Sequence, residues 1–205
     1  MHMLNPHCGV ERDPRGVVRL TICNAGSLNI LGSAAINGVR EGLEALATEP
    51  QIRVLVIAGQ SEKSMIGGAD IKEMATLDQA SAETFITGLR DLCEAVRVFP
   101  QPVIARMPGW CLGGGLEFAA ACDFRIAAHD ARFGMPEVRV GIPSVIHAAL
   151  LECGPEALRA QKAQLRQWEE LPLKQSVDLS IGVFGQSFLT GEPQRLMQAF
   201  VDRKR

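Results

Sequence analysis

The sequence lacks an excess of charge of either sign. Its 205 residues include 21 Lys and Arg and 23 Asp and Glu, which gives a net charge of −2. A protein that binds nucleic acid or an anionic membrane by electrostatics needs a basic surface. The sequence also lacks an apolar run near the ~20 residues of a membrane span, and residues 1–16 have no apolar signal core. We therefore expect a cytoplasmic protein with no nucleic-acid or membrane partner.

Patterns for metal binding and for disulfides are missing as well. None of the six cysteines forms a CxxC pair, and none of the four histidines has metal-ligand spacing with another ligand. Several cysteines lie in apolar contexts, so we expect reduced, buried thiols of an intracellular protein. His147 lies in the apolar run IPSVIHAALL and is more often a satisfied core histidine than a base. No metal is expected.

Strand and helix patterns alternate along the chain, and 47% of the residues are hydrophobic. Such alternation favours an α/β fold with a largely parallel sheet, and this length favours one domain. Residues 1–16 are polar and turn-rich, and we expect a loose arm there. The expected strands are 17–22, 53–58, 102–106, 123–127 and the extended piece 131–134, and the expected helices are 30–48, 81–99, 116–122, a helix from 141–143 onward, 155–169, 172–189 and 192–203.

A glycine-rich corner lies in residues 102–137. Gly113, Gly114 and Gly115 fall where an expected strand hands over to a helix. Free N–H groups and the helix dipole there favour a negative charge, and glycine lets a ligand approach the backbone. Glu117 follows inside an otherwise apolar helix, where a carboxylate is costly unless it is paired or used. The simpler interpretation is a tight connection, with Glu117 only offsetting the helix dipole.

A second corner of the same design lies upstream, in SMIGGADIKEM at residues 64–74. Gly67 and Gly68 separate an apolar strand from a second helix start. Two strand–glycine–helix corners in one domain can aim two N–H groups at one oxygen atom. This is the geometry of an oxyanion hole.

Three segments together resemble a known family. GGADIKEM, GWCLGGGLEFAAACD and ARFGMPEVRVGIP resemble, in order and spacing, the signature blocks of the crotonase family, the enoyl-CoA hydratase/isomerase superfamily. The resemblance covers nearly all of residues 10–151. It implies an α/β crotonase (ClpP-like) fold of repeated ββα units followed by C-terminal helices, with a core domain at 1–151 and a helical region at 152–205 for cover and oligomerisation.

The resemblance also implies roles for individual residues. The N–H groups of Ala69 and Gly114 would form the oxyanion hole for a thioester carbonyl. Glu117 would act as base and Glu137 as proton donor, although coupled carboxyl groups leave this division open. Further contacts to substrate and CoA would come from Gly67, Gly68, Asp70, Ile71, Gly113, Phe184 and Arg203. As alternatives, Glu137 could be a solvated loop residue, Phe184 a core aromatic and Arg203 a solvated terminal charge.

The implied activity is addition of water across the 2,3-double bond of an enoyl-CoA, with coenzyme A as part of the substrate and no other cofactor. An alternative on the same scaffold is an isomerase that moves a 3,4-double bond to the 2,3-position. After Leu151 the sequence departs from the family, in which a long helical stretch precedes the final helices. Either this segment is deleted from the protein, or it is absent only from the sequence as given. This opens a third hypothesis from another class, a non-catalytic CoA-binding relative.

The C-terminal tail has an amphipathic pattern. Leu189, Leu196, Met197 and Phe200 are apolar, whereas Arg195 and residues 202–205 are charged. An exposed apolar stripe would be an aggregation liability in a monomer. We therefore expect a homo-oligomer, a trimer or a dimer of trimers by resemblance to the family, in which the tail is required.

Overall fold

The computed structural model describes residues 1–137, 160 and 171–202. The chain divides into two compact units, and each is described by itself. The first comprises Met1–Ala69 and Gly88–Phe133, and the second comprises Asp70–Thr87 and Gly134–Arg205. The expected division at residue 151 and the helices expected from 141 and at 155–169 fall outside the described residues, apart from residue 160. His147, Cys153 and Arg203 also lie outside them.

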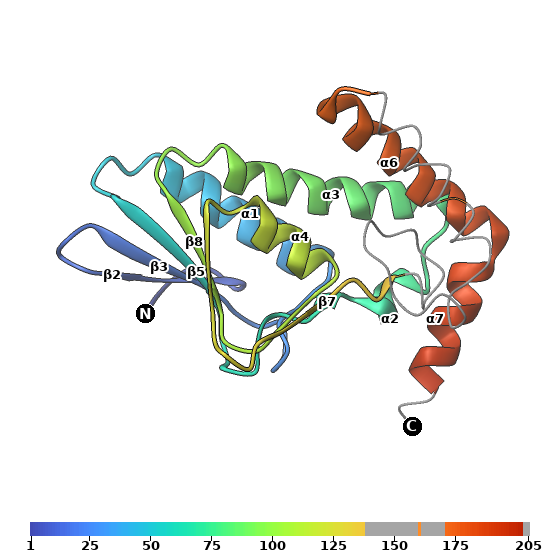
Figure 1. Ribbon diagram of the computed structural model, residues 1–205, viewed down its shortest axis with the longest axis horizontal. Coiled ribbons are helices and arrows are strands. Elements are labelled where there is room, and N and C mark those ends of the chain that lie inside the picture. The colour runs from blue at the N-terminus through green and yellow to red at the C-terminus, as the bar shows by residue number, and fades with distance from the viewer. Residues whose placement is uncertain (138–159, 161–170, 203–205) are drawn as a thin grey trace. The chain divides into compact units, whose positions relative to one another are not determined.

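The first unit is built on a six-stranded sheet with the strand order β1-β2-β3-β5-β8-β10 (Figure 1). Its strands are β1 (His2–Asn5), β2 (Cys8–Arg12), β3 (Val17–Ile22), β5 (Val54–Gly59), β8 (Val103–Met107) and β10 (Phe124–Ala127). β3, β5, β8 and β10 run parallel to one another. The expected α/β architecture with a largely parallel sheet is confirmed.

The expectation of a loose arm at residues 1–16 was wrong. β1 and β2 pair antiparallel with each other, and β2 continues the sheet beside β3. Cys8 and Val10 are at most 1% exposed. The two short strands carry few apolar residues of their own. β2 becomes a strand because β3 offers an open edge whose N–H and C=O groups need partners, and β1 pairs in turn with the edge of β2.

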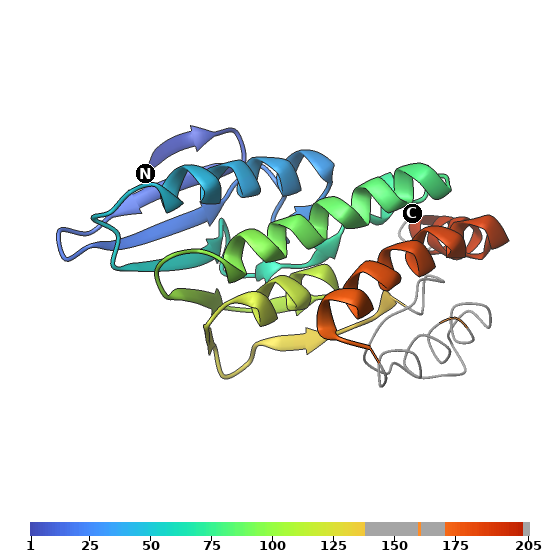
Figure 2. The ribbon, with the colours of Figure 1, turned by 90° about the horizontal axis from the view of Figure 1, so that it is seen from above.

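Helices cover one face of this sheet. Figures 1 and 2 show α1 (Ser33–Ala47), α3 (Gln79–Arg97) and α4 (Gly114–Ala121) on the same side. One face of α3 is buried, with Leu89, Leu92, Val96 and Phe99 of the first unit each at most 8% exposed. The sheet contributes buried residues at alternate positions, Leu20, Leu55 and Val103 among them. This layer is the core of the first unit.

Two smaller sheets complete the first unit. The three-stranded sheet has the order β11-β9-β6, and β4 pairs with β7. The strands concerned are β4 (Ile30–Leu31), β6 (Ser64–Ile66), β7 (Gly68–Ala69), β9 (Trp110–Leu112) and β11 (Arg132–Gly134). The glycine-rich corner before the expected helix 116–122 therefore contains the strand β9. At this corner β8, β9 and α4 follow in sequence as the expected ββα unit. At the other corner two short strands, β6 and β7, stand between β5 and α2.

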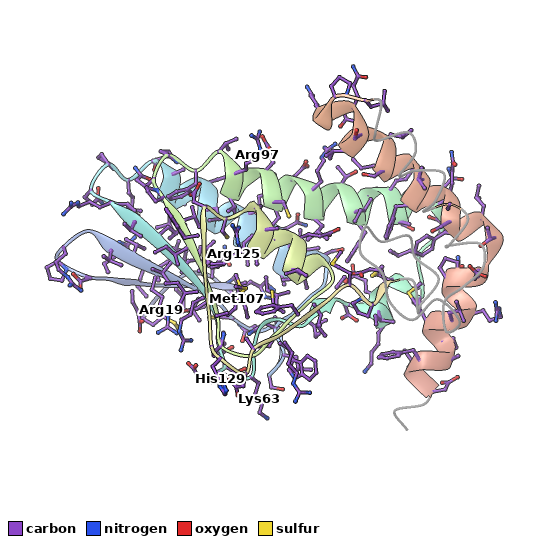
Figure 3. The ribbon with its side chains drawn as sticks, viewed as in Figure 1. Arg19, Lys63, Arg97, Met107, Arg125 and His129 are labelled. Atoms are coloured by element: carbon purple, nitrogen blue, oxygen red, sulfur yellow. The ribbon has the colours of Figure 1, made fainter. Side chains whose placement is uncertain are left out.

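The opposite face of the six-stranded sheet is more open. Arg19, between the buried residues Val18 and Leu20, lies on this face (Figure 3). On the edge strand β10, Phe124 is 57% exposed and Ile126 is 61% exposed. Arg125 points the other way, because its Nη1 donates to the carbonyl oxygens of residues 119, 120 and 122 at the end of α4, at 3.2, 3.1 and 2.8 Å. A cation there suits the negative end of the helix dipole.

The second unit is helical in its described part. It contains α2 (Ile71–Met74), the start of α3, α6 (Leu173–Ser187), the 3-10 turn Phe188–Thr190 and α7 (Glu192–Asp202). The Gln194 amide nitrogen of α7 donates to the carbonyl oxygens of Leu77 and Phe188 at 3.4 and 3.1 Å. α7 buries Met197 completely. Among the helices of residues 1–137 and 171–202, none has the length and apolar character needed to cross a membrane.

Candidate active site

The first glycine corner is the connection from β6 through Gly67 to β7. The Gly67 N–H donates to the Leu28 carbonyl oxygen at 2.7 Å. Gly68 has a φ of +119°, a conformation that side chains rarely adopt and glycine accepts. Ala69 pairs with Leu31 in the β4–β7 ladder and is half-buried. The corner is thus held in place by the segment that precedes α1.

The second glycine corner leads from β9 into α4. Gly113, with a φ of +53°, is the residue before the helix, and no side-chain hydrogen bond caps it. The N–H groups of Leu116 and Glu117 donate to the Gly113 carbonyl oxygen at 2.8 and 3.1 Å. Gly114 is the first helical residue, so its N–H lies at the positive end of α4 and has no intrahelical acceptor.

The two corners pack directly against each other. A Cβ atom at Gly115 would lie 2.5 Å from the Ile66 carbonyl oxygen, and one at Gly68 would lie 3.5 Å from the Leu112 carbonyl oxygen. Parallel pairing of β6 with β9 aligns the strands that lead into the corners. The structure therefore brings the corners of Ala69 and Gly114 together, and it does so because Gly115 has no side chain.

Glu117 lies on α4, one turn after the second corner. The residue is exposed to solvent, yet the protein atoms around its carboxyl group desolvate it and raise its pKa. The two observations concern different properties: solvent reaches the residue, while the surrounding protein disfavours the charged form. A carboxyl group of this kind is accessible to a substrate and has a pKa moved toward neutrality, as a general base requires.

Three cysteines surround this part of the first unit. Burial raises the pKa of Cys111 and Cys122 to about 12. Desolvation also raises the pKa of Cys93, with the nearby Glu117 charge as the next cause. The five cysteines within the described ranges are free thiols, and four of them are buried. The expectation of reduced thiols is confirmed for these five, and the expectation of buried thiols for four of them.

The remaining candidate residues belong to the second unit. Asp70 caps α2 by accepting hydrogen bonds from the N–H groups of Lys72 and Glu73 at 2.9 and 3.3 Å. Ile71 and Glu137 are half-buried. The Phe184 ring is buried and lies 5.5 Å from the Phe188 ring, centroid to centroid. The predicted CoA contacts of these residues and of Arg203 stay predictions.

One residue that sequence reasoning missed is Asn29. It is completely buried, has a φ of +50°, and its side chain donates to the Ser64 carbonyl oxygen at 2.9 Å. Asn29 falls between the expected strand 17–22 and the expected helix 30–48, and this position gives no sign that its side chain reaches a strand 35 residues away. Among residues 1–137, 160 and 171–202, no cluster of three or more His, Cys, Asp or Glu could hold a metal ion.

Comparisons with known proteins point to one family. The family model described as "Enoyl-CoA hydratase/isomerase" matches residues 12–149. A probable enoyl-CoA hydratase from Mycobacterium bovis is 42% identical over 136 residues, which cover 65% of this chain and 50% of that protein. A crotonyl-CoA hydratase from Syntrophomonas wolfei is 37% identical over 116 residues, 57% of this chain and 45% of that protein. The chain spans about half the length of the curated relatives it matches.

Solved structures agree on the fold. The enoyl-CoA hydratase from Bacillus anthracis superposes with a TM-score of 0.63 at 29% identity, covering 86% of this chain and 62% of that chain. The enoyl-CoA hydratase from Thermoplasma volcanium superposes with a TM-score of 0.64 at 22% identity, covering 98% of this chain and 99% of that chain. The crotonase fold expected from the sequence is confirmed, and the chain belongs to the enoyl-CoA hydratase/isomerase (crotonase) family.

Proposed function

We propose that this protein is an enoyl-CoA hydratase, which adds water across the 2,3-double bond of an enoyl-CoA thioester. One observation carries the proposal: the two glycine corners pack together with no room for a side chain at Gly115. The backbone N–H groups of Ala69 and Gly114 are the donors proposed to bind the thioester oxygen. Family membership and the hydratase names of several relatives support the same reaction class.

The chemistry makes an oxyanion hole useful. When the oxygen of water bonds to C3, the electron pair of the double bond moves through C2 onto the thioester oxygen, which becomes an enolate. Two fixed N–H donors stabilise that charge, and loss of one such donor typically costs about 3 kcal/mol of activation free energy. Protonation at C2 then restores the thioester carbonyl. Water and the enoyl thioester are both consumed, and coenzyme A stays attached throughout.

Two carboxyl groups would handle the protons. Glu117 is the proposed base that takes a proton from the attacking water, and its desolvated carboxyl group supports that role. Glu137 is the proposed donor of the proton to C2, on the strength of its position in the segment ARFGMPE alone. Gly67, Gly68, Asp70, Ile71, Gly113, Phe184 and Arg203 are proposed to contact the substrate or its CoA.

Separate assays of Glu117→Gln and Glu137→Gln with crotonyl-CoA test the proposal. Each change should lower kcat about 10²- to 10⁴-fold, the usual contribution of a positioned acid or base. Glu41→Gln, on the exposed side of α1, is the matched control and should leave kcat unchanged. Near-normal hydration in either variant would remove that glutamate from the mechanism.

The alternatives are separated by substrate. Comparing turnover of a 2-enoyl-CoA with that of a 3-enoyl-CoA distinguishes hydration from double-bond isomerisation. Turnover of neither substrate would favour the non-catalytic CoA-binding relative. In that case the intact mass becomes informative. A mass near 22.2 kDa means that the segment after Leu151 is truly deleted, and a clearly larger mass means that it is present in the protein.

The proposal also includes a homo-oligomer, either a trimer or a dimer of trimers, that is located in the cytoplasm. The exposed side chains of Phe124 and Ile126 in the first unit, and of Leu189 at 69% exposure in the second, support association. Light scattering on the full chain and on a chain ending at Gly191 would test this. A monodisperse monomer, or an unchanged active oligomer after truncation, would contradict it. Two relatives are mitochondrial by name, and this describes those proteins.

A further inference from the structure

The segment of residues 28–31 contacts the first glycine corner through Leu28, Ile30 and Leu31. Leu28 accepts the Gly67 N–H through its carbonyl oxygen at 2.7 Å. Ile30 and Leu31 pair with Gly68 and Ala69 in the β4–β7 ladder. Asn29 stands between these backbone contacts. The position of Asn29 therefore fixes the positions of Leu28 and Ile30, whose backbone groups contact the corner.

The Asn29 side chain extends this connection to two further strands. Its Nδ2 donates to the Ser64 carbonyl oxygen on β6 at 2.9 Å, and its Oδ1 accepts the N–H of Gln60, which follows β5, at 3.4 Å. The residue is completely buried, where an unmade hydrogen bond is costly. One amide group thus holds together the end of β5 and the start of β6.

Two further features fit the Asn29 amide. Asn29 has a φ of +50°, a left-handed conformation that asparagine tolerates better than most residues. Gly59 leaves the space that the amide fills, because a Cβ atom there would collide with Asn29 Nδ2 and lie 2.7 Å from the Met65 carbonyl oxygen. Backbone conformation, hydrogen bonds and packing all select the same side chain at this position.

We infer that Asn29 is a positioning residue, which fixes the strand carrying Ala69 and so sets the direction of the first N–H group of the oxyanion hole. This inference rests on the proposed function for its catalytic part. Asn29 acts through Ser64, Gly67 and Gly68 and does not touch the substrate. Losing its amide should loosen the corner without removing any donor.

Two substitutions separate the contributions of this residue. Asn29→Asp keeps the shape and the acceptor for Gln60, but it replaces the donated bond to Ser64 with a repulsive contact between two oxygens and buries a carboxyl group. Asn29→Gly keeps access to a positive φ and removes both bonds. Asn24 offers matched controls, because it has a φ of +54° but is exposed, and its side-chain amide donates to Pro6. Its bond to the Gln60 side chain is made by its backbone N–H, which the substitutions keep.

Amide hydrogen exchange of residues 60–69 is the first measurement. Asn29→Asp and Asn29→Gly should speed exchange in this segment at least tenfold, whereas Asn24→Asp and Asn24→Gly should leave it unchanged. The second measurement is hydration of crotonyl-CoA. Both Asn29 variants should lower kcat about 10- to 100-fold, part of the effect of losing one donor, with KM changed less than about threefold.

The third measurement is the carbonyl stretching frequency of bound butyryl-CoA, a saturated thioester that cannot be hydrated. The oxyanion hole should lower this frequency, and the Asn29 variants should reduce that lowering, which a mere loss of global stability would not do. Exchange and kcat equal to those of the Asn24 variants would overturn the inference. If the native chain does not hydrate crotonyl-CoA, the proposed function fails, and the exchange experiment still decides whether Asn29 holds the corner.

Discussion

The two glycine corners have similar sequences, but different interactions hold them in place. The Gly67–Ala69 corner is fixed by hydrogen bonds from residues 28–31, far back in the chain. The Gly113–Gly115 corner has no side-chain cap and is fixed by close packing on Ile66 and on Leu89, whose Cδ2 would lie 2.7 Å from a Cβ atom at Gly114. Similar glycine motifs therefore differ in which substitutions they tolerate.

This difference also explains what each corner contributes to the proposed reaction. The second corner opens a helix of eight residues, so its N–H groups have the support of a helix dipole. Ala69 precedes Asp70, which caps a helix of only four residues. The direction of its N–H group depends mainly on strand pairing. We expect the first corner to be sensitive to substitutions far away in the sequence, such as those at Asn29. The second corner should be sensitive to an increase in side-chain volume within the corner itself.

Among substitutions within the two corners, the largest fall in kcat is expected from Gly115→Ala, which breaks the packing of the second corner on the first. The new methyl group would lie 2.5 Å from the Ile66 carbonyl oxygen, a backbone atom that cannot move without separating the corners. We expect a loss of about 1–3 kcal/mol in the free energy of unfolding and a fall in kcat of about 10²–10³-fold. Chemical denaturation and the hydration assay measure the two effects.

Gly88→Ala is the matched control for this change. Gly88 lies inside α3, and a Cβ atom there would meet only the Ile36 Cγ2 at an ordinary distance of 3.5 Å. Alanine favours the helix by up to about 1 kcal/mol over glycine. The control should therefore be as stable as the native chain or more so, with normal kcat. Equal destabilisation by both substitutions would mean that Gly115 has no special packing role.

A smaller effect is expected from Gly68→Ala in the first corner. Space is available, since the nearest atom to a new Cβ is the Leu112 carbonyl oxygen at 3.5 Å, but the φ of +119° is unfavourable for alanine. We expect a strain of about 1–3 kcal/mol, visible in thermal or chemical unfolding. Gly26→Ala, at a φ of +71° with no atom within 4 Å, is the control. It should cost similar stability and leave kcat unchanged, whereas Gly68→Ala should lower kcat as well.

The smallest expected effect on the free energy of unfolding concerns Glu117, whose carboxyl group follows the second corner. Desolvation raises its pKa in the folded state above the ordinary value of 4.5, so the folded chain holds this proton to higher pH than the unfolded chain does. The free energy of unfolding should then fall as pH rises from about 4.5 through the raised pKa. Glu117→Gln should lack this decline and be at least as stable as the native chain at neutral pH.

Denaturation of the native chain and of Glu117→Gln between pH 4 and pH 8 measures this difference. Glu41→Gln again serves as the control, because its side chain is exposed on α1. The acid limb of kcat/KM should also lie above the pH range of an ordinary glutamate. Identical pH profiles for all three proteins would show that the carboxyl group of Glu117 is not desolvated.

Local patterns were enough to predict most of the parallel strands and helices. The strand 17–22 and the apolar face of the helix beginning near residue 81 repeat with the period of their structure, and both are found as expected. The strands at 2–5 and 8–12 were missed. They carry little periodic signal and exist because a neighbouring strand provides the ladder. The short strand at 110–112 was missed as well, because the glycines around it give little periodic signal and its ladder is provided by neighbouring strands.

The sequence by itself was enough to locate the two glycine corners and to single out Glu117. The freedom of glycine to adopt a positive φ and the charge of a carboxyl group are properties of the residue type, and they do not depend on the fold. The sequence also determined the family, through three motifs in order. Only the tertiary structure decided that Gly115 must lack a side chain, since that depends on the Ile66 carbonyl oxygen. The structure also revealed the role of Asn29, because its hydrogen-bond partner at Ser64 is 35 residues away and no local pattern encodes such a contact.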